Sequence, residues 1–354
     1  MRVGLVLGAG GVTGGAWLTG ALQALVEETG WDPGSADVVV GTSAGSMIGA
    51  LIAGGGIPPW FMVAHSGGEV FEGLTDRQGR PASEADRSAG ARFRPDRALP
   101  LPGPGSLRMA VGTLRHPRRH TALALLAGWV PTGLVSTEPL KEVVRRAVPD
   151  GWGAHPRLWL MACDYATGER VAFGREGAPY ADLADAAAAS CAIPGFYRPV
   201  RIRGRRYVDG GVCSLSNLDV VAREELDLVI CLNPGSSRDR IGGPTAALRA
   251  AAGRRLGHEA RKVLSTGAEV LLVQPTAADH AVMGSNPLSG GRRQEIVETA
   301  IRTTHLQLEE RPEMRAALRN LPLGAPHVRE RPPGPPSTWP SFDDVAAARW
   351  SSAA

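Results

Sequence analysis

The sequence predicts an α/β fold with a mainly parallel central sheet that helices cover on both faces. Short apolar runs rich in β-branched residues alternate with longer segments of helical character. Glycine-rich turns connect the first two strands to the segments that follow them. The chain has 354 residues, of which 43% are apolar, so it can bury a large core in one large domain or two ordinary ones.

The first fifty residues alternate between strand and helix. A strand at residues 3–7 is followed by a glycine turn at 8–15 and a helix from about Ala16 to Glu28. A second apolar strand at 37–41 leads to a sharp turn and a short helix, which Gly54-Gly55-Gly56 ends. A βαβα beginning of this kind is typical of a parallel sheet.

The later chain is expected to extend this sheet within a domain spanning residues 1–320. The same patterns predict strands at 158–163, 170–173, 199–202, 228–232 and 270–273, and helices at 137–147, 180–190, 216–224, 244–264 and 292–318. Beyond Leu321 the chain becomes proline-rich and is expected to form a C-terminal tail, 321–354, without catalytic residues.

Residues 75–135 interrupt the pattern and are interpreted as a lid or cap insertion. Residues 75–106 are rich in Arg, Pro, Gly, Ser and Asp and show little periodicity, which is typical of a long loop. Residues 107–130 mix apolar side chains with a basic cluster formed by Arg115, His116, Arg118, Arg119 and His120. Such a mixture suits a cap over an acyl groove or a surface that touches a membrane. Ordinary helices packed on the sheet beside a solvated basic turn are the alternative interpretation.

Composition excludes several functional classes. The net charge of +4 is small and diffuse, which argues against a nucleic-acid partner. The four cysteines lack C-x-x-C spacing, so neither a zinc site nor a disulfide framework is expected. No apolar run reaches the ~18 residues of a membrane span, and the apolar start breaks at Gly8. We therefore expect a cytoplasmic protein without a zinc site; no other metal and no organic cofactor are expected either.

The turn Gly41-Thr42-Ser43-Ala44-Gly45 has the Gly-x-Ser-x-Gly form of a nucleophile elbow. It lies between a buried strand and a helix, which is the context that this motif requires. The flanking glycines allow a sharp bend, and the helix that follows points its positive end at the serine hydroxyl. Ser43 is therefore a candidate catalytic nucleophile.

The glycine loop that follows the first strand is a candidate oxyanion hole. Unpaired N–H groups of the turn 8–15 would meet the start of a helix there. The same loop resembles a dinucleotide clamp, since Gly8, Gly10 and Gly14 approach a G-x-G-x-x-G pattern. However, Thr13 stands where the stricter pattern has glycine, and the second strand ends without an acidic residue for ribose.

A general base for Ser43 has two kinds of candidate. Asp209 stands in an Asp209-Gly210-Gly211 turn after an apolar and basic strand, although such a turn is often only a β-turn. His258 or His280 would instead complete a Ser-His-Asp triad, but neither lies at a glycine-marked strand end.

Together the three sites resemble the patatin-like phospholipase family. The stretch Ala189–Pro199 adds to the match, because it is similar to the Ser-x-Ala-x-Pro segment that precedes the family's Asp-Gly-Gly turn. The glycines that carry the resemblance are Gly8, Gly14, Gly41, Gly45, Gly210 and Gly211. It implies a three-layer α/β fold with the elbow after the second strand, and a phospholipase A or carboxylesterase activity on lipid esters. Ser43 and Asp209 would act as a catalytic dyad without histidine.

One departure from the family separates the functional alternatives. The family's loop reads Gly-Gly-Gly-x-Arg-Gly, whereas this chain has Thr13 at the position of the arginine. The backbone donors of Gly10, Gly11 and Val12 remain, but the cation does not. A non-catalytic lipid-binding protein is therefore one alternative and a dinucleotide-binding protein another. The resemblance also leaves open peripheral contact with the inner face of the membrane.

Overall fold

The fold is built on an eight-stranded sheet. The computed structural model describes residues 1–66, 93–96, 103–115, 120–149, 151–240, 242–243, 245–322 and 344. The strand order is β5-β6-β3-β2-β1-β7-β8, and β4 pairs with β3 off this path. The strands are β1 (Val3–Leu7), β2 (Val38–Thr42), β3 (Leu158–Asp164), β4 (Arg170–Phe173), β5 (Val200–Ile202), β6 (Arg205–Asp209), β7 (Leu228–Leu232) and β8 (Glu269–Val273).

Most of the sheet is parallel, as the sequence predicts. β3, β2, β1, β7 and β8 run parallel in that order, with Leu7 opposite both Gly41 and Leu232. β4 and β6 are antiparallel to β3, and β5 is antiparallel to β6. All residues of β1, β2, β3 and β7 are buried, which explains their continuous apolar sequences.

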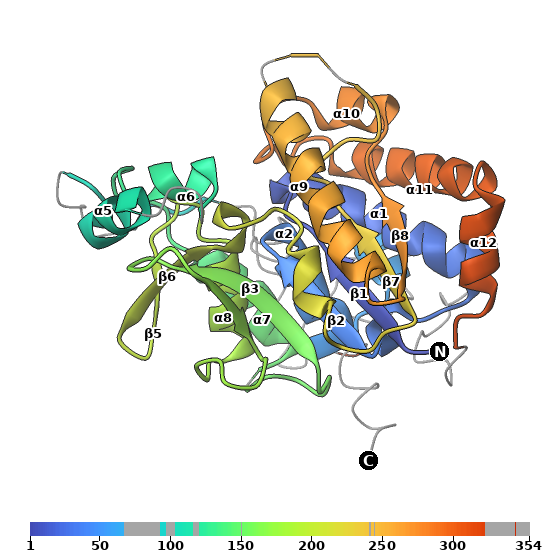
Figure 1. Cartoon of the computed structure of the whole chain (residues 1–354), viewed down its shortest axis with the longest axis horizontal. Helices are drawn as coiled ribbons and strands as arrows, with labels where there is room; N and C mark the ends of the chain where they lie inside the picture. Colours follow the sequence, from blue (N-terminus) through green and yellow to red (C-terminus); the bar gives the residue numbers. More distant parts are fainter. Residues whose placement is uncertain are drawn as a thin grey trace.

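Helices cover both faces of this sheet. The helices are α1 (Gly11–Thr29), α2 (Ala44–Gly49), α3 (Pro59–Ser66), α5 (Leu107–Arg115), α6 (Ala122–Ala127), α7 (Glu138–Ala147), α8 (Leu183–Ser190), α9 (Ala246–Leu264), α10 (Ala277–Met283), α11 (Arg293–Glu309) and α12 (Pro312–Arg319). Leu5 and Leu7 pack in one core with α1, α3, α7, α8 and α11, whereas Val6 packs in a second core with α9. Alternate residues of β1 thus face opposite cores, and the sheet lies between α9 and α1 (Figure 1). The three-layer arrangement is confirmed.

Two predicted helix boundaries are wrong. The first helix begins at Gly11 and not at Ala16, because the glycine turn is already helical: the Gly14 N–H donates to Gly10 O at 3.0 Å. The segment expected as one helix at 292–318 is two, α11 and α12, which separate at Pro312. Proline has no N–H to continue a helix but fits the first turn of a new one.

Three short elements also differ from expectation. The helix predicted at 216–224 is reduced to a 3₁₀ turn at Leu218–Val221. The pattern missed β6, whose Arg205 and Arg206 hide its strand character, and it missed α10. α10 begins with a capping box in which Thr276 and Asp279 exchange hydrogen bonds.

Parts of the predicted insertion and tail lie outside the described residues. These are 75–92 and 97–102 of the long loop, 116–119 of the basic cluster, and 323–343 with 345–354 of the tail. Within the described residues, no helix combines the length and apolar character needed to cross a bilayer.

Candidate active site

Ser43 stands at a strained turn between β2 and α2. Its backbone has φ 52° and ψ −118°, a region that residues with a side chain rarely adopt. The glycines on either side permit this bend. A Cβ on Gly45 would lie 2.1 Å from the carbonyl oxygen of Leu7, and one on Gly41 would lie 2.5 Å from that of Gly45. No side chain fits at either glycine, so the elbow packs directly against the end of β1.

The Ser43 hydroxyl contacts the Asp209 carboxylate directly. Ser43 Oγ donates a hydrogen bond to Asp209 Oδ2 at 2.7 Å, and both residues are only 5% exposed. Asp209 is the last residue of β6, where it lies opposite Ala162 of β3. β3 in turn pairs with β2, which ends beside Ser43. The sheet therefore brings together two side chains that are far apart in the sequence.

Burial changes the acidity of Asp209. Removal from water raises the pKa of its carboxyl from 3.8 to about 6, because it disfavours the charged form. Hydrogen bonds from the Ser43 hydroxyl and the Gly211 N–H oppose this shift, the latter at 2.7 Å to Oδ1. The carboxylate is consequently ionised at neutral pH and is a stronger base than an exposed aspartate.

Ser190 holds the backbone of the elbow. The N–H of Ser43 donates to Ser190 Oγ at 2.9 Å, and Ser190 Oγ donates to the carbonyl of Met161 at 2.6 Å. Ser190 belongs to the stretch Ala189–Pro199, whose Ala192 also accepts a hydrogen bond from the Asp209 N–H at 3.0 Å. The sequence pointed to this stretch but assigned no role to the serine hydroxyl.

Asn217 ties the loop after Asp209 to the end of β2. It is fully buried and has φ 50°, and its Nδ2 donates to Thr42 Oγ1 at 3.0 Å and to Ser214 O at 2.7 Å. Sequence reasoning missed this residue. The signal available was weak, because asparagine tolerates positive φ in many surface turns as well.

The glycine loop lies beside both the Ser43 elbow and the Asp209 turn. A Cβ on Gly211 would lie 3.5 Å from the Cβ of Ala9, and one on Gly15 would lie 3.8 Å from that of Ala44. Gly10 is the residue before α1, and Gly11 has φ 66°. The loop is therefore placed against the elbow on one side and the Asp-Gly-Gly turn on the other.

Hydrogen bonding separates the N–H groups of this loop into two sets. Those of Gly8, Ala9, Thr13 and Gly14 donate to Leu232 O, Leu215 O, Pro287 O and Gly10 O at 2.7–3.1 Å. Those of Gly10, Gly11 and Val12 donate to none of the residues that the structure describes. The three donors expected from the sequence are thus the free ones at the start of α1. Thr13 is buried and places no cation near them.

Comparison with known proteins identifies the family. The family model described as patatin-like phospholipase matches residues 5–222, which is more than half of the chain. The chain belongs to this family. Patatin-like phospholipases are acyl hydrolases that act on lipids, and the resemblance seen in the sequence is confirmed. Among solved structures, the chain is similar to the crystal structure of VipD from Legionella pneumophila. That match has 15% identity, covers 87% of this chain and 67% of VipD, and has a TM-score of 0.41.

The histidines considered for a triad lie elsewhere in this patatin-like chain. His280, on α10, contacts Arg249 through a hydrogen bond. Burial and the Arg249 charge lower the pKa of His280 from 6.5 to about 4. His258 is exposed on α9. Ser43 and Asp209 contact each other directly, so neither histidine lies between their side chains.

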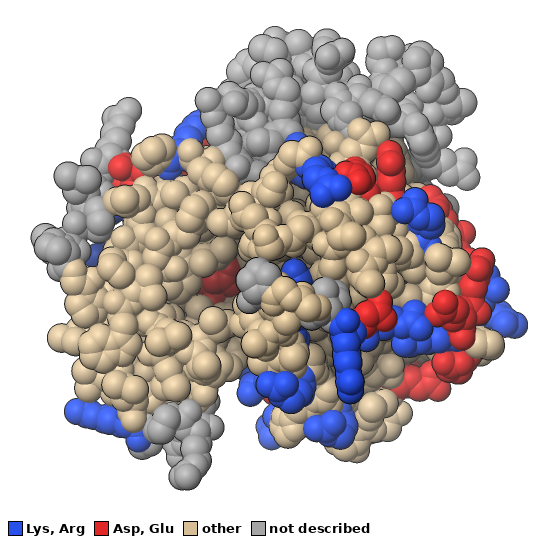
Figure 2. Space-filling view, turned by 90° about the horizontal axis from the view of Figure 1, so that it is seen from above, with Lys and Arg blue, Asp and Glu red and all other residues tan. Residues whose placement is uncertain are grey.

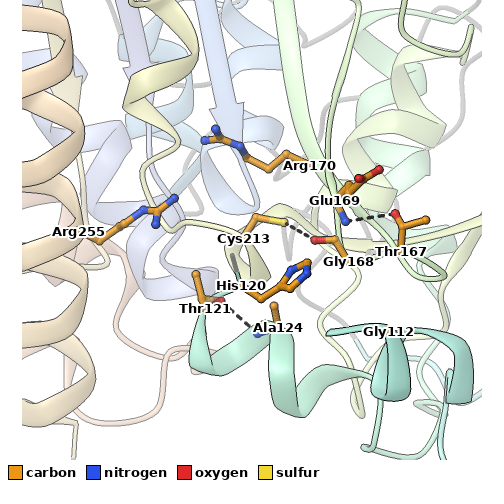
Figure 3. Close-up of a pocket in the computed structure, with 10 residues that line it drawn as sticks. All are labelled: Gly112, His120, Thr121, Ala124, Thr167, Gly168, Glu169, Arg170, Cys213 and Arg255. Carbon is orange, nitrogen blue, oxygen red and sulfur yellow. Dashed lines mark hydrogen bonds between the residues drawn. The ribbon is translucent and has the colours of Figure 1, made fainter. Parts of the chain in front are cut away.

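A cavity of about 370 Å³ lies between the start of α6 and the turn at Thr167, Gly168 and Glu169 (Figure 3). Its lining includes Cys213, His120, Arg170 and Arg255, but neither Ser43 nor Asp209. Both arginines are held by acidic partners, Arg170 by Asp219 and Arg255 by Glu259. Within the described residues of this patatin-like fold, no group of three His, Cys, Asp or Glu side chains is arranged to hold a metal ion.

Proposed function

We propose that this chain is a serine hydrolase that cleaves carboxylic ester bonds of lipids with Ser43 as nucleophile and Asp209 as general base. The observation that carries the proposal is the 2.7 Å hydrogen bond from Ser43 Oγ to Asp209 Oδ2 at a strained elbow. Family membership supports the lipid substrate, and the raised pKa of Asp209 supports its role as a base.

Acylation begins when Ser43 Oγ bonds to the ester carbonyl carbon and its proton passes to Asp209 Oδ2. The carbonyl oxygen becomes an oxyanion. As the tetrahedral intermediate collapses, the bond to the alcohol oxygen breaks, and Asp209 returns the proton to that oxygen. The products of this half-reaction are a free alcohol and an acyl group on Ser43.

Deacylation repeats the same proton transfers with water. Asp209 accepts a proton from a water molecule as the water oxygen bonds to the acyl carbon. When the bond to Ser43 Oγ breaks, the proton returns to that oxygen, and the carboxylic acid leaves. No histidine is needed, because one carboxylate contacts the atom that gains and loses the proton.

The N–H groups of Gly10, Gly11 and Val12 are proposed as the oxyanion hole. They are free among the described residues and stand at the start of α1, whose dipole favours negative charge. Ser190 and Asn217 would hold the elbow and the Asp209 turn in a fixed relative position, through hydrogen bonds to Ser43 N–H and Thr42 Oγ1 respectively.

We also propose a division of the chain around this site. Residues 1–320 would form the hydrolase domain, with 75–135 as its cap, and residues 321–354 would be a tail that contributes nothing to the chemistry. Deletion of 323–354 tests the last point, because it should leave ester hydrolysis unchanged.

The test of the mechanism compares wild type, Ser43→Ala and Asp209→Asn on p-nitrophenyl esters and on phospholipids. Each substitution should lower kcat by at least about 100-fold, because each removes a group that acts in both half-reactions. A fluorophosphonate probe should label wild type and not Ser43→Ala. Folded wild type that neither turns over esters nor reacts with the probe would refute the proposal. If such protein still floated with liposomes, a non-catalytic lipid-binding protein would remain, and a thermal shift with NAD(H) or NADP(H) would favour the dinucleotide alternative.

A further inference from the structure

Helices α5 and α6 expose large apolar side chains on their outward side. Leu107 is 61% exposed and Leu126 is 62% exposed. Val111 and Leu114 of α5, Leu123 of α6, and Trp129 just after α6 are also exposed. Leu107, Val111 and Leu114 follow one another at helical spacing, so they form a single stripe along α5. The two helices contact each other, and several exposed large apolar side chains on neighbouring helices are typical of an interaction site.

The opposite side of both helices is firmly packed. Met109, Ala124 and Ala127 belong to a buried cluster with Val208 and Val212, on either side of Asp209. Two hydrogen bonds fix α6 in place: Thr121 Oγ1 donates to Val212 O, and Tyr165 OH donates to Ala127 O at 3.2 Å. The outward apolar side therefore belongs to an ordered pair of helices attached to the catalytic turn.

The sequence of this segment carries basic residues and no acidic ones, and the acidic residue near it comes from elsewhere: Glu169 lines one cavity with Gly112 of α5 and Ala124 of α6. Between Asp96 and Glu138 the sequence contains no acidic residue and five arginines. Two of these, Arg108 and Arg115, are exposed on α5 beside the apolar stripe. α5 and α6 lie together at one end of the molecule, away from α11 and α12 (Figure 1). Viewed from above, acidic and basic side chains are densest on the opposite side of the molecule (Figure 2).

We propose that the outward side of α5 and α6 docks the enzyme on an anionic lipid bilayer. This docking face consists of Leu107, Arg108, Leu114, Arg115, Leu126 and Trp129. Exposed leucines and a tryptophan enter the boundary between headgroups and acyl chains, while arginines stay at the phosphates. The absence of acidic residues from this stretch fits a negatively charged surface. The inference rests on the proposed function, because docking here would bring lipid esters to Ser43.

The first experiment measures binding to vesicles of phosphatidylcholine with 30 mol% phosphatidylglycerol, in a Ser43→Ala background that prevents turnover. Leu114→Ser combined with Leu126→Ser should weaken binding by at least about tenfold, because two buried leucine side chains are lost from the interface. The matched control is Leu248→Ser with Leu264→Ser on α9, whose leucines are 49% and 51% exposed. The control should bind as the parent does.

The second experiment separates charge from apolar contact. Arg108→Gln with Arg115→Gln should weaken binding to the anionic vesicles by about 20-fold, roughly fivefold for each arginine, at low salt. It should have little effect on vesicles of phosphatidylcholine alone, and 0.5 M NaCl should remove most of the difference. Arg240→Gln with Arg254→Gln replaces two exposed arginines outside the face and serves as the control.

Three results would overturn the proposed docking face. Wild type would fail to bind the anionic vesicles, or the leucine and arginine variants would bind them as well as their controls do. In the third, the protein would form a concentration-dependent dimer that the leucine variant abolishes while vesicle binding stays unchanged. Hydrolysis of a soluble p-nitrophenyl ester, measured with Ser43 restored, should be unchanged in the docking variants and shows that they fold. Vesicle binding through this face without ester turnover by wild type would refute the catalytic proposal alone.

Discussion

Replacing Asp209 with asparagine should stabilise the fold at alkaline pH while it removes activity. The carboxyl has a pKa of about 6 in the fold, against 3.8 for an unburied aspartate, because it is buried. The folded protein therefore holds this proton more tightly than the unfolded chain does. The stability that the neutral carboxyl provides is fully present below pH 3.8 and is lost as pH rises through about 6.

The magnitude follows from the difference between the two pKa values. Each unit corresponds to about 1.4 kcal/mol, so full ionisation of Asp209 lowers the free energy of unfolding by about 3 kcal/mol. Asparagine has nearly the same shape and no charge. Its oxygen can accept from the Gly211 N–H, and its amide can donate to Ser43 Oγ, so the local hydrogen bonds are retained. We expect Asp209→Asn to be more stable than wild type at pH 8 by up to about 3 kcal/mol.

Urea unfolding of both proteins at pH 8 and pH 5 tests this reasoning. The stability advantage of the variant should shrink by roughly half between pH 8 and pH 5, because Asp209 is mostly protonated in folded wild type at pH 5. Glu176→Gln, which neutralises an exposed carboxylate, should show almost no such change. An advantage that is equal at the two pH values, or that grows on acidification, would refute the burial of a charged carboxylate at this site.

Three further predictions concern the same site. Hydrolysis of a soluble ester should fall about tenfold per pH unit below the Asp209 pKa of about 6, and a flat kcat/KM between pH 7 and pH 4.5 would contradict a role for that base. Ser43→Gly should be more stable than Ser43→Ala by about 1 kcal/mol in thermal or urea unfolding, because glycine adopts φ 52° without strain. The larger conformational entropy that glycine gives up on folding offsets only part of this stabilisation. Equal stabilities would mean that the strain at the elbow is no larger than the entropic cost of glycine. Ser190→Ala should lower kcat by about tenfold with a smaller change in KM, since it releases the Ser43 N–H, and Ser190→Thr should restore part of the loss. A loss confined to KM would instead assign Ser190 to substrate binding.

The sequence was most informative where a local pattern is compatible with only one kind of structure. Buried parallel strands need continuous apolar runs, and these located β1, β2, β3 and β7 almost to the residue. The strands expected at 170–173, 199–202 and 270–273 were also found within one residue at each end. Prediction from the sequence failed where the local pattern and the fold disagree. β6 was not predicted because it contains two arginines, and the glycines in the first turn of α1 were predicted to form a loop.

By itself, the sequence determined the α/β fold, the family and three glycine-marked segments, because a sharp elbow, a free N–H loop and an Asp-Gly-Gly turn each require glycine at fixed positions. The residues alone left both histidine and aspartate candidates for the partner of Ser43, and the resemblance to the family favoured Asp209. Only the tertiary structure shows the contact itself, because the pairing of β6 with β3 places Asp209 Oδ2 at 2.7 Å from Ser43 Oγ. The tertiary structure also set the acidity of Asp209, because burial and hydrogen-bond partners arise from segments that are distant in the chain.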